Sequence, residues 1–186
     1  MLTRTNPIRR LQPYVLYFML YAVFGWCYEV FLEVCIYHWG FTNRGVLFGP
    51  YCPIYGVGAM MFLLCFGRLM RRRGGKLFRI CRPALVFAGS MAVATAVELA
   101  ASYLLEWTVG SWPWQTYADY AWNFQARIAL SPSVRFGIGG VLFLYIMQPL
   151  FERLVGRLGP KAMDIVSATV VVVLCVDIVA TVLTYL

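Results

Sequence analysis

Charged side chains and histidine are scarce in this sequence. Asp, Glu, Lys and Arg make up 13% of its 186 residues, and His38 is the single histidine. Six cysteines are present, but none follows the CxxC spacing that is typical of a metal or redox site. We therefore expect neither a metal ion nor a cofactor. HExxH motifs and nucleophile–base pairs are also missing, which makes an enzyme the less favoured class.

Long apolar runs dominate what is present. Hydrophobic residues account for 61% of the chain and aromatic residues for 17%. Five runs each approach the ~20 residues that cross the hydrocarbon core of a bilayer, and they cover residues 14–37, 52–69, 83–105, 133–151 and 163–185. We predict an all-α integral membrane protein with five transmembrane helices, in which residues 1–186 form a single polytopic domain. The first run lacks a small-residue cleavage site, so we expect a retained anchor rather than a signal peptide.

The basic residues gather on alternate loops. Three precede the first run, seven fill the loop between the second and third runs, and three lie between the fourth and fifth. This bias predicts a multi-pass protein of the cell membrane with a cytoplasmic N-terminus and an outer C-terminus. The net charge of +8 then reflects topology and contact with anionic lipid, and we expect no nucleic-acid partner. Arg44, Arg127 and Arg135 break the pattern, because they lie on the outer side.

Acidic residues lie inside three of the apolar runs. Glu29, Glu98 and Asp177 each follow the start of their run by about 15 residues, which is about 22 Å along a helix. Because an unpaired charge in hydrocarbon is costly, we expect Arg44 and Arg127 to pair with Glu29 or Glu98. Two interpretations stay open. The charges form a partly hydrated cavity in the outer half of the bundle, or they are ion pairs that only lock helices together.

The loop after the first run combines apolar residues with glycine and proline. Its sequence over residues 41–58 is FTNRGVLFGPYCPIYGVG. Such a segment cannot form a continuous helix, and its apolar residues are poorly suited to water. We predict a re-entrant or broken outer segment, which survives at membrane depth only inside protein or beside a wet cavity. Asn43 and Arg44 on this segment supply donors for a carboxylate or a phosphate.

The third loop, residues 106–132, is rich in tryptophan and tyrosine and predicts an aromatic belt at the outer interface. Asp119, Asn123 and Arg127 follow one another at four-residue spacing, which predicts one face of a helix. Ser131-Pro132 is typical of the cap and first turn of the next span.

The order of the motifs indicates an internal repeat. Each of the two deep glutamates is followed by an outer loop with an asparagine and an arginine. Each loop leads into an aromatic-Gly-aliphatic-Gly motif, at residues 55–58 and 136–139. Both units run in the same direction, which predicts a parallel 2+2 helix pseudo-repeat plus one extra helix. Glycines at these positions also serve simply to let helices approach closely.

These motifs resemble a known family. GWxxE around Glu29 and NRGxLxGPxxPIYGxG over residues 43–58 are similar to the CmpB-type ABC-transporter membrane family, which has distant eukaryotic relatives. The resemblance covers roughly residues 15–155 and implies transport, although no ATP-binding domain accompanies it. It implies family-type positions at Glu29, Asn43, Arg44, Gly45, Gly49, Pro50, Pro53, Tyr55, Gly56, Glu98, Asp119, Asn123 and Arg127. Residues 115–118 read QTYA where relatives have WDYS, so an acidic and a hydroxyl side chain are missing there.

Three functions follow from these observations. The first is a small transporter or permease-like protein for an anionic or zwitterionic solute or a lipid headgroup. Because five spans make a thin wall, membrane lipid and a homodimer or a partner transporter subunit are the expected partners. The second is an integral-membrane enzyme acting on a lipid or prenyl-phosphate substrate, and the third is a lipid-binding or assembly factor. The candidate substrate-binding residues are Glu29, Asn43, Arg44, Tyr55, Glu98, Asp119, Asn123 and Arg127.

Overall fold

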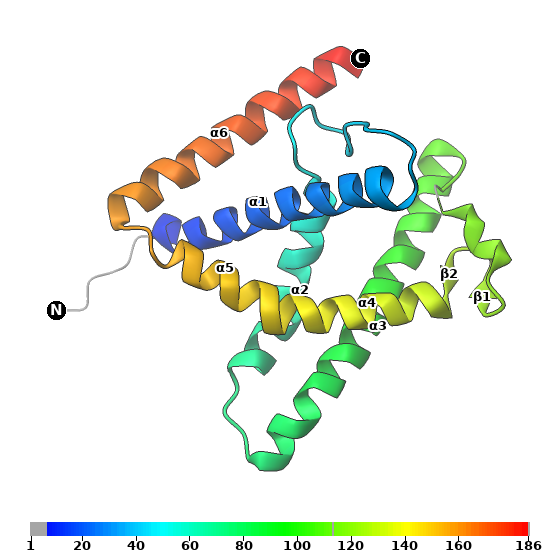
Figure 1. Ribbon diagram of the computed structural model, residues 1–186, viewed down its shortest axis with the longest axis horizontal. Helices are drawn as coiled ribbons and strands as arrows, with labels where there is room; N and C mark the ends of the chain where they lie inside the picture. The colour runs from blue at the N-terminus through cyan, green and yellow to red at the C-terminus, as the bar shows by residue number, and fades with distance from the viewer. Residues whose placement is uncertain (1–6, 113, 186) are drawn as a thin grey trace. The chain divides into compact units, whose positions relative to one another are not determined.

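The computed structural model describes residues 7–112 and 114–185, and Arg4, one of the basic residues before the first span, lies outside them. Five helical segments are long and apolar enough to cross a membrane: Ile8–Ile36, Pro53–Arg71, Lys76–Thr108, Leu130–Val155 and Pro160–Thr184. The prediction of an all-α membrane protein with five spanning helices is therefore confirmed (Figure 1).

The elements follow one another in a simple order. They are α1 (Pro7–Phe31), the π-helix η1 (Leu32–Ile36), α2 (Pro53–Arg71), α3 (Lys76–Val109), the 3-10 helix η2 (Gln115–Asp119), β1 (Asn123–Phe124), β2 (Ile128–Ala129), α4 (Leu130–Leu142), the π-helix η3 (Phe143–Met147), α5 (Gln148–Val155) and α6 (Pro160–Tyr185). β1 and β2 form an antiparallel hairpin in which Asn123 pairs with Ala129.

Two helices begin seven residues earlier than the apolar runs predict. α3 starts at Lys76 and carries Pro83 inside it, although the sequence suggests a start at residue 83. Lysine and arginine are good helix formers, so the basic stretch before Pro83 continues the helix beyond the hydrocarbon. Gly75, in an extended conformation, precedes the first turn. α1 likewise begins at Pro7, a position where the missing N–H of proline costs no helical hydrogen bond.

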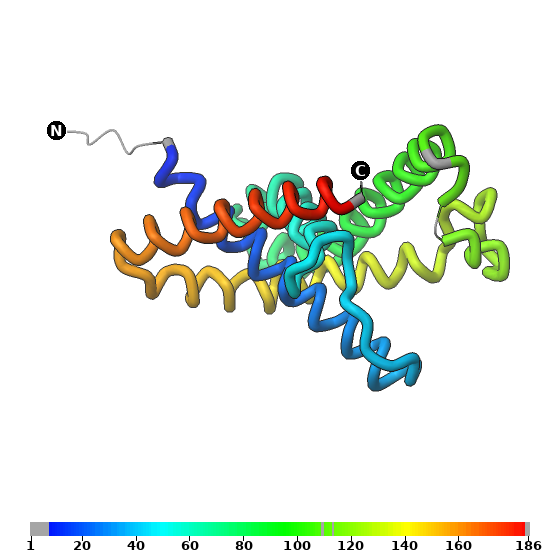
Figure 2. Tube along the Cα trace, turned by 90° about the horizontal axis from the view of Figure 1, so that it is seen from above, coloured from blue at the N-terminus to red at the C-terminus, as the bar shows by residue number. Residues whose placement is uncertain are grey.

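The chain divides into two compact units. Unit 1 comprises Met1–Leu63 and Gln148–Leu186, and unit 2 comprises Leu64–Met147. In unit 1, α1 packs against α6 and α5, and Figure 2 shows α6 in orange and red beside α1 in blue. The core of unit 1 contains Tyr21, whose ring lies 4.7 Å from that of Phe151 in an edge-to-face contact. The Tyr21 hydroxyl donates to Gln148 Oε1 at 3.0 Å, so this buried polar pair is satisfied.

Unit 2 is built on α3 and α4, which pack side by side. The close approach depends on Gly137 of α4, since a Cβ at this position would lie 2.7 Å from the ring of Phe87. Thr95 of α3 donates to Ser133 Oγ of α4 at 2.7 Å, and Ser133 in turn donates to the carbonyl oxygen of Ala129. Small and hydrogen-bonded residues thus line the contact, as is usual between membrane helices.

Large apolar side chains remain exposed along the helices. On α6 they include Ile165, Val172, Val176, Val179 and Leu183. A continuous apolar surface of this kind is unfavourable in water, whereas lipid tails cover it without cost. The exposed faces therefore agree with a multi-pass membrane protein.

Candidate functional site

The loop that follows η1 turns back along the first span. The chain leaves η1 at Ile36, yet the Cys52 backbone N–H donates to the carbonyl oxygen of Ala22 at 2.9 Å. Ala22 lies about 14 residues before Ile36, so the loop returns about 21 Å along the helix. Because the span runs from Ile8 to Ile36, α2 starts beside its middle. Irregular backbone thus penetrates between α1 and its neighbours, in the manner of a re-entrant segment.

Asp177 of α6 anchors this loop. Its carboxylate accepts hydrogen bonds from the backbone N–H groups of Phe48 at 2.9 Å and Gly49 at 2.8 Å. The hydroxyl groups of Tyr51 and Thr181 also donate to it. Burial, followed by the hydrogen bond to Asp177, raises the pKa of Tyr51 to about 12, so its hydroxyl stays a donor. Among the described residues, the Asp177 carboxyl group is therefore contacted by four donors and by no cation.

Asn43 shapes the loop from within. Its Oδ1 accepts a hydrogen bond from the indole N–H of Trp26 at 2.8 Å. Its Nδ2 donates to the carbonyl oxygens of Leu47 at 3.3 Å and Phe48 at 3.0 Å. The amide thus closes the loop and ties it to α1.

Arg44 pairs with Glu33 and not with Glu29, so the predicted pairing is wrong for this arginine. Arg44 Nε lies 3.0 Å from Glu33 Oε2, and Nη2 lies 2.8 Å from Oε1, which is a bidentate pair. Thr42 adds a hydroxyl donor at 2.6 Å. Glu33 is one helical turn beyond Glu29 and hence nearer the point where the loop leaves the helix. It is only 3% exposed, whereas the Arg44 side chain is 34% exposed.

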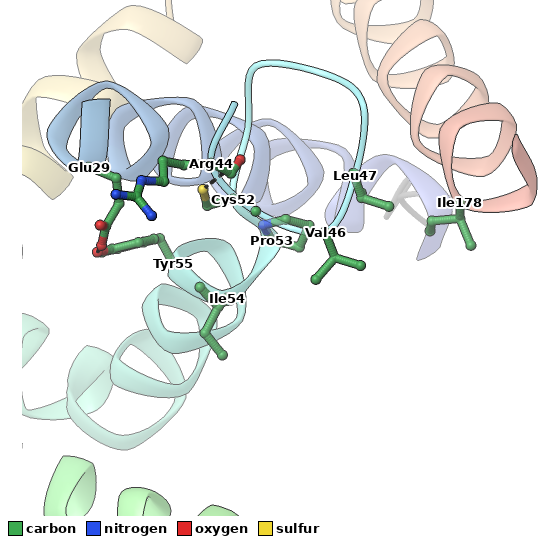
Figure 3. A pocket seen from close by; sticks show the side chains of 10 residues that line it. Glu29, Arg44, Val46, Leu47, Cys52, Pro53, Ile54, Tyr55 and Ile178 are labelled. Atoms are coloured by element: carbon green, nitrogen blue, oxygen red, sulfur yellow. Dashed lines mark hydrogen bonds between the residues drawn. The ribbon is translucent and has the colours of Figure 1, made fainter. Parts of the chain in front are cut away.

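Glu29 lies at one end of a groove in unit 1 (Figure 3). The Tyr55 hydroxyl donates to Glu29 Oε1, and Arg44 extends toward the same end of the groove. The groove has a volume of about 450 Å³ and is lined by Glu29, Arg44, Gly45, Val46, Leu47, Cys52, Pro53, Ile54, Tyr55 and Ile178. Burial raises the pKa of the Cys52 thiol, so this lining residue is a neutral, weakly reactive group. The groove therefore combines charged groups at one end with apolar walls.

In unit 2, Arg127 is held by aromatic rings and by Glu106. Its guanidinium carbon lies 4.1 Å from the ring centre of Tyr103 and 4.0 Å from that of Trp112, a double cation–π contact. Nη2 forms an ion pair with Glu106, and Nη1 donates to Ser102 Oγ at 3.4 Å. The predicted pairing with Glu98 is therefore wrong. Glu106 lies two turns beyond Glu98, at the level of the loop that carries the arginine.

Glu98 instead contacts a tyrosine of the loop. The Tyr117 hydroxyl donates to Glu98 Oε1 at 2.8 Å. Burial, and after it the hydrogen bond to Glu98, raises the pKa of Tyr117, so this hydroxyl remains protonated. Tyr117 matches the tyrosine of the WDYS pattern, although the other three residues of this stretch differ from it, and it supplies the deep glutamate with a donor.

Asp119, Asn123 and Arg127 do not share a helical face, so this prediction is wrong. Asp119 is exposed at the end of η2, and Asn123 begins the β1–β2 hairpin. Gln125 and Ala126 adopt positive φ angles of 52° and 54°, which a helix does not allow. Asn123 stabilises the turn, because its Oδ1 accepts from the Ala126 N–H at 3.1 Å.

The fourth span also starts differently from the expectation. α4 begins at Leu130 with Ala129 as its N-cap, and no side chain caps it. The hairpin replaces the cap, because the Leu130 N–H donates to the carbonyl oxygen of Trp122 at 2.8 Å. Ser131 therefore lies inside the helix, where its hydroxyl accepts from Arg135 at 3.3 Å.

A family model described as "Putative ABC-transporter type IV" matches residues 16–182. The chain belongs to this family. All the contacts around Glu29 and Glu98 lie within the matched region, as does the anchor Asp177. Searches among curated proteins and solved structures find no match. This member of the ABC-transporter type IV family therefore carries two polar clusters, one in each unit.

The sequence predicted the arginine of each cluster in this family member, but not the glutamate with which each arginine pairs. Glu33 follows Glu29 by four residues, and Glu106 follows Glu98 by eight. Both spacings place a second carboxylate on the same helical face and nearer the loop. That signal was sufficient to identify Glu33 and Glu106 as competing partners.

Proposed function

We propose that this chain is a small permease-like component of the cell membrane whose unit 1 groove takes a zwitterionic amphiphile, such as a lipid headgroup with its chains. The observation that carries the proposal is the composition of the groove. Glu29 and Arg44 line it together with Val46, Leu47 and Ile178. A ligand that carries both charges and an apolar tail matches such a lining.

Charge balance favours a zwitterion over a simple anion. Arg44 already donates through Nε and Nη2 to Glu33, so its charge is largely compensated. Its Nη1 group is directed to no acceptor in the described part of the chain and is suited to a phosphate or carboxylate oxygen. Glu29 uses Oε1 for Tyr55, which leaves Oε2 for an ammonium group. Arg44, Glu33 and Glu29 supply one positive and two negative groups, which favours a ligand with a positive group in addition to its negative one.

The apolar walls favour an amphiphile over a small polar solute. Ile54 and Leu47 continue the groove away from the charged end, toward Ile178 of α6 (Figure 3). Aliphatic walls stabilise hydrocarbon chains but offer nothing to a hydrophilic solute. We expect the headgroup near Glu29 and the chains along these residues.

Transport is the activity that this groove would serve. Family membership supports it, and the described residues consist of five spanning helices and their connecting segments, without an ATP-binding domain among them. We propose that a partner subunit supplies the energy, with the N-terminus of this chain in the cytoplasm as the basic loops predict. A lipid-binding assembly factor is the second candidate, because the polar groups of Asn43 and Arg127 form contacts within the protein.

Native mass spectrometry of gently extracted protein tests the groove. We expect wild-type protein to retain zwitterionic lipid in preference to anionic lipid. Glu29→Gln and Arg44→Lys should both reduce retention, because each removes one half of the headgroup recognition. Arg9→Gln, which breaks an exposed ion pair with Asp164, is the matched control and should retain lipid normally. Equal retention in all four proteins would refute the groove as the binding site.

Transport itself needs a separate measurement in vesicles. Movement of a fluorescent zwitterionic lipid between leaflets should depend on the protein and fall in the Glu29→Gln variant. Wild-type protein that binds the lipid in native mass spectrometry but moves none would favour the assembly factor over the permease.

A further inference from the structure

The carboxyl groups inside the spans differ in how many donors they receive. Glu33 accepts from Thr42 and from two nitrogens of Arg44, and Asp177 accepts from four donors. Glu29 has a single donor but lines the open groove. Glu98 alone combines a single donor with a buried oxygen, Oε2, that has no hydrogen-bond partner within residues 7–112 and 114–185.

The two arginines of unit 2 that follow Glu98 in the sequence are engaged elsewhere. Arg127, on the loop, is paired with Glu106 and enclosed by two rings. Arg135, on α4, donates to Ser131. Neither forms an ion pair with Glu98 under a 4.0 Å limit among the described residues.

The tyrosine that donates to Glu98 cannot neutralise it. Tyr117 holds its own proton, because its pKa is raised, and Tyr120 packs edge-to-face on Tyr117 with ring centres 5.7 Å apart. Tyr117 therefore donates one hydrogen bond to Oε1 and provides no positive charge.

We propose that Glu98 is a proton-binding site, occupied at neutral pH by a proton on Oε2. An ionised Glu98 would leave a charged oxygen buried without a donor, and buried groups in this position neutralise instead. The neutral acid leaves one O–H without an acceptor, which costs less than an unpaired charge. In the acid, Oε1 acts as the carbonyl oxygen and accepts from Tyr117.

The site releases its proton only when Oε2 becomes hydrated. The O–H bond at Oε2 then breaks, the proton passes to water as hydronium, and the entering water donates hydrogen bonds to the carboxylate until the Tyr117 hydroxyl returns to Oε1. Because Tyr117 belongs to the loop, displacement of the loop opens Oε2 and permits the exchange. The ligand of the site is therefore a proton, and its binding does not depend on what the unit 1 groove carries.

Infrared difference spectroscopy of the full chain in lipid vesicles tests the proposal. At neutral pH, wild-type protein should show the carbonyl stretch of a protonated carboxyl group, with the shift that deuterium exchange produces. Glu98→Gln should abolish this band. Glu29→Gln is the matched control, because it removes the other deep glutamate and should leave the band unchanged. A band absent from wild-type protein, or lost in the control instead, would overturn the proposal.

Tyr117→Phe provides a second readout that does not require removal of the glutamate. It deletes the single donor to Oε1, so the carbonyl stretch should move to the higher frequency of a group without a hydrogen bond, while the band persists. An unmoved band would show that the protonated group is not Glu98. This variant keeps the test decisive if Glu98→Gln fails to fold.

Discussion

The two units place similar residues on similar helices, but their deep glutamates have different surroundings. Phe18 precedes Glu29 by eleven residues in unit 1, and Phe87 precedes Glu98 by eleven residues in unit 2. In each unit the phenylalanine packs against the first glycine of the aromatic-Gly-aliphatic-Gly motif, at residues 56 and 137. The common pattern supports the predicted pseudo-repeat as a local arrangement within each unit.

The difference lies in the hydroxyl that reaches each glutamate. In unit 1 the aromatic residue of the motif, Tyr55, donates to Glu29. The corresponding residue of unit 2 is Phe136, which has no hydroxyl, and Tyr117 of the loop donates to Glu98 instead. In unit 1 the donor belongs to α2, and the loop lines a groove beside Glu29. In unit 2 the donor belongs to the loop, and one oxygen of Glu98 is buried. The aromatic position of the shared motif therefore differs between the unit with the groove and the unit with the buried carboxyl oxygen.

Removal of the unit 1 anchor should have the largest effect, because Asp177 accepts four hydrogen bonds, whereas Glu98 and Glu106 each accept one from the unit 2 loop. Asp177→Ala leaves the N–H groups of Phe48 and Gly49 and the Tyr51 hydroxyl without their acceptor. We expect a loss on the order of 3 kcal/mol in the free energy of unfolding. Hydrogen exchange should accelerate at residues 37–52 and stay unchanged at residues 110–129. Equal acceleration in both loops would show that the units are not independent.

Adding a methyl group at the glycines where the helices pack closely should be the next most destabilising change. Gly56→Ala places a Cβ 2.7 Å from the Phe18 ring and 2.8 Å from its carbonyl oxygen, whereas Gly137→Ala meets only the ring of Phe87. A ring can rotate away but backbone cannot, so Gly56→Ala should cost more, with both within about 1–3 kcal/mol. Thermal unfolding in detergent measures the order, and the reverse order would contradict the structure.

Replacing each arginine with lysine should lower stability more at the buried Arg127 than at the half-exposed Arg44. Arg127 is 6% exposed and lies between two rings, so Arg127→Lys should cost about 1–2 kcal/mol. The side chain of Arg44 is 34% exposed, and Arg44→Lys should cost less than about 1 kcal/mol. Unfolding midpoints of the two variants compare them directly. If Arg44→Lys proved the more harmful, the ion pair with Glu33 would outweigh the aromatic enclosure of Arg127.

Cysteine labelling should alter stability least and test whether both loops face the same side. Phe41→Cys and Gln115→Cys place thiols at exposed positions in the two loops, in a background without native cysteines. We expect an impermeant reagent to label both from outside the cell, as the basic residues predict. Labelling of the two thiols from opposite sides would rule out a parallel repeat.

The five spans were predictable because each is a long apolar run, a signal that packing does not change. The hairpin at residues 123–129 was not, since Asn123 and Arg127 have the spacing of a helix and only the positive φ angles of residues 125 and 126 reveal the turn. Residue spacing shows which side chains would share a face if a helix formed, but tertiary contacts decide whether the helix forms at all.

The polar clusters show a similar limit. Sequence periodicity identifies the face on which Glu29 and Glu33 lie together, but it does not say which one meets Arg44. That choice depends on where along the span the loop begins. The loop follows the π-helix η1, which contains Glu33. The role of Tyr117 was hidden for another reason, because no helical spacing relates this loop residue to a glutamate 19 residues earlier.

The anchoring of the first loop by α6 has a consequence for biosynthesis. Unit 2 is continuous, so a ribosome completes it before any of Gln148–Leu186 has been made. Unit 1 must wait, because its loop needs the carboxylate of Asp177, which is added more than a hundred residues later. At ~5–20 residues per second, the loop remains without its anchor for at least several seconds. During this interval a chaperone or an insertase has access to the unfinished groove.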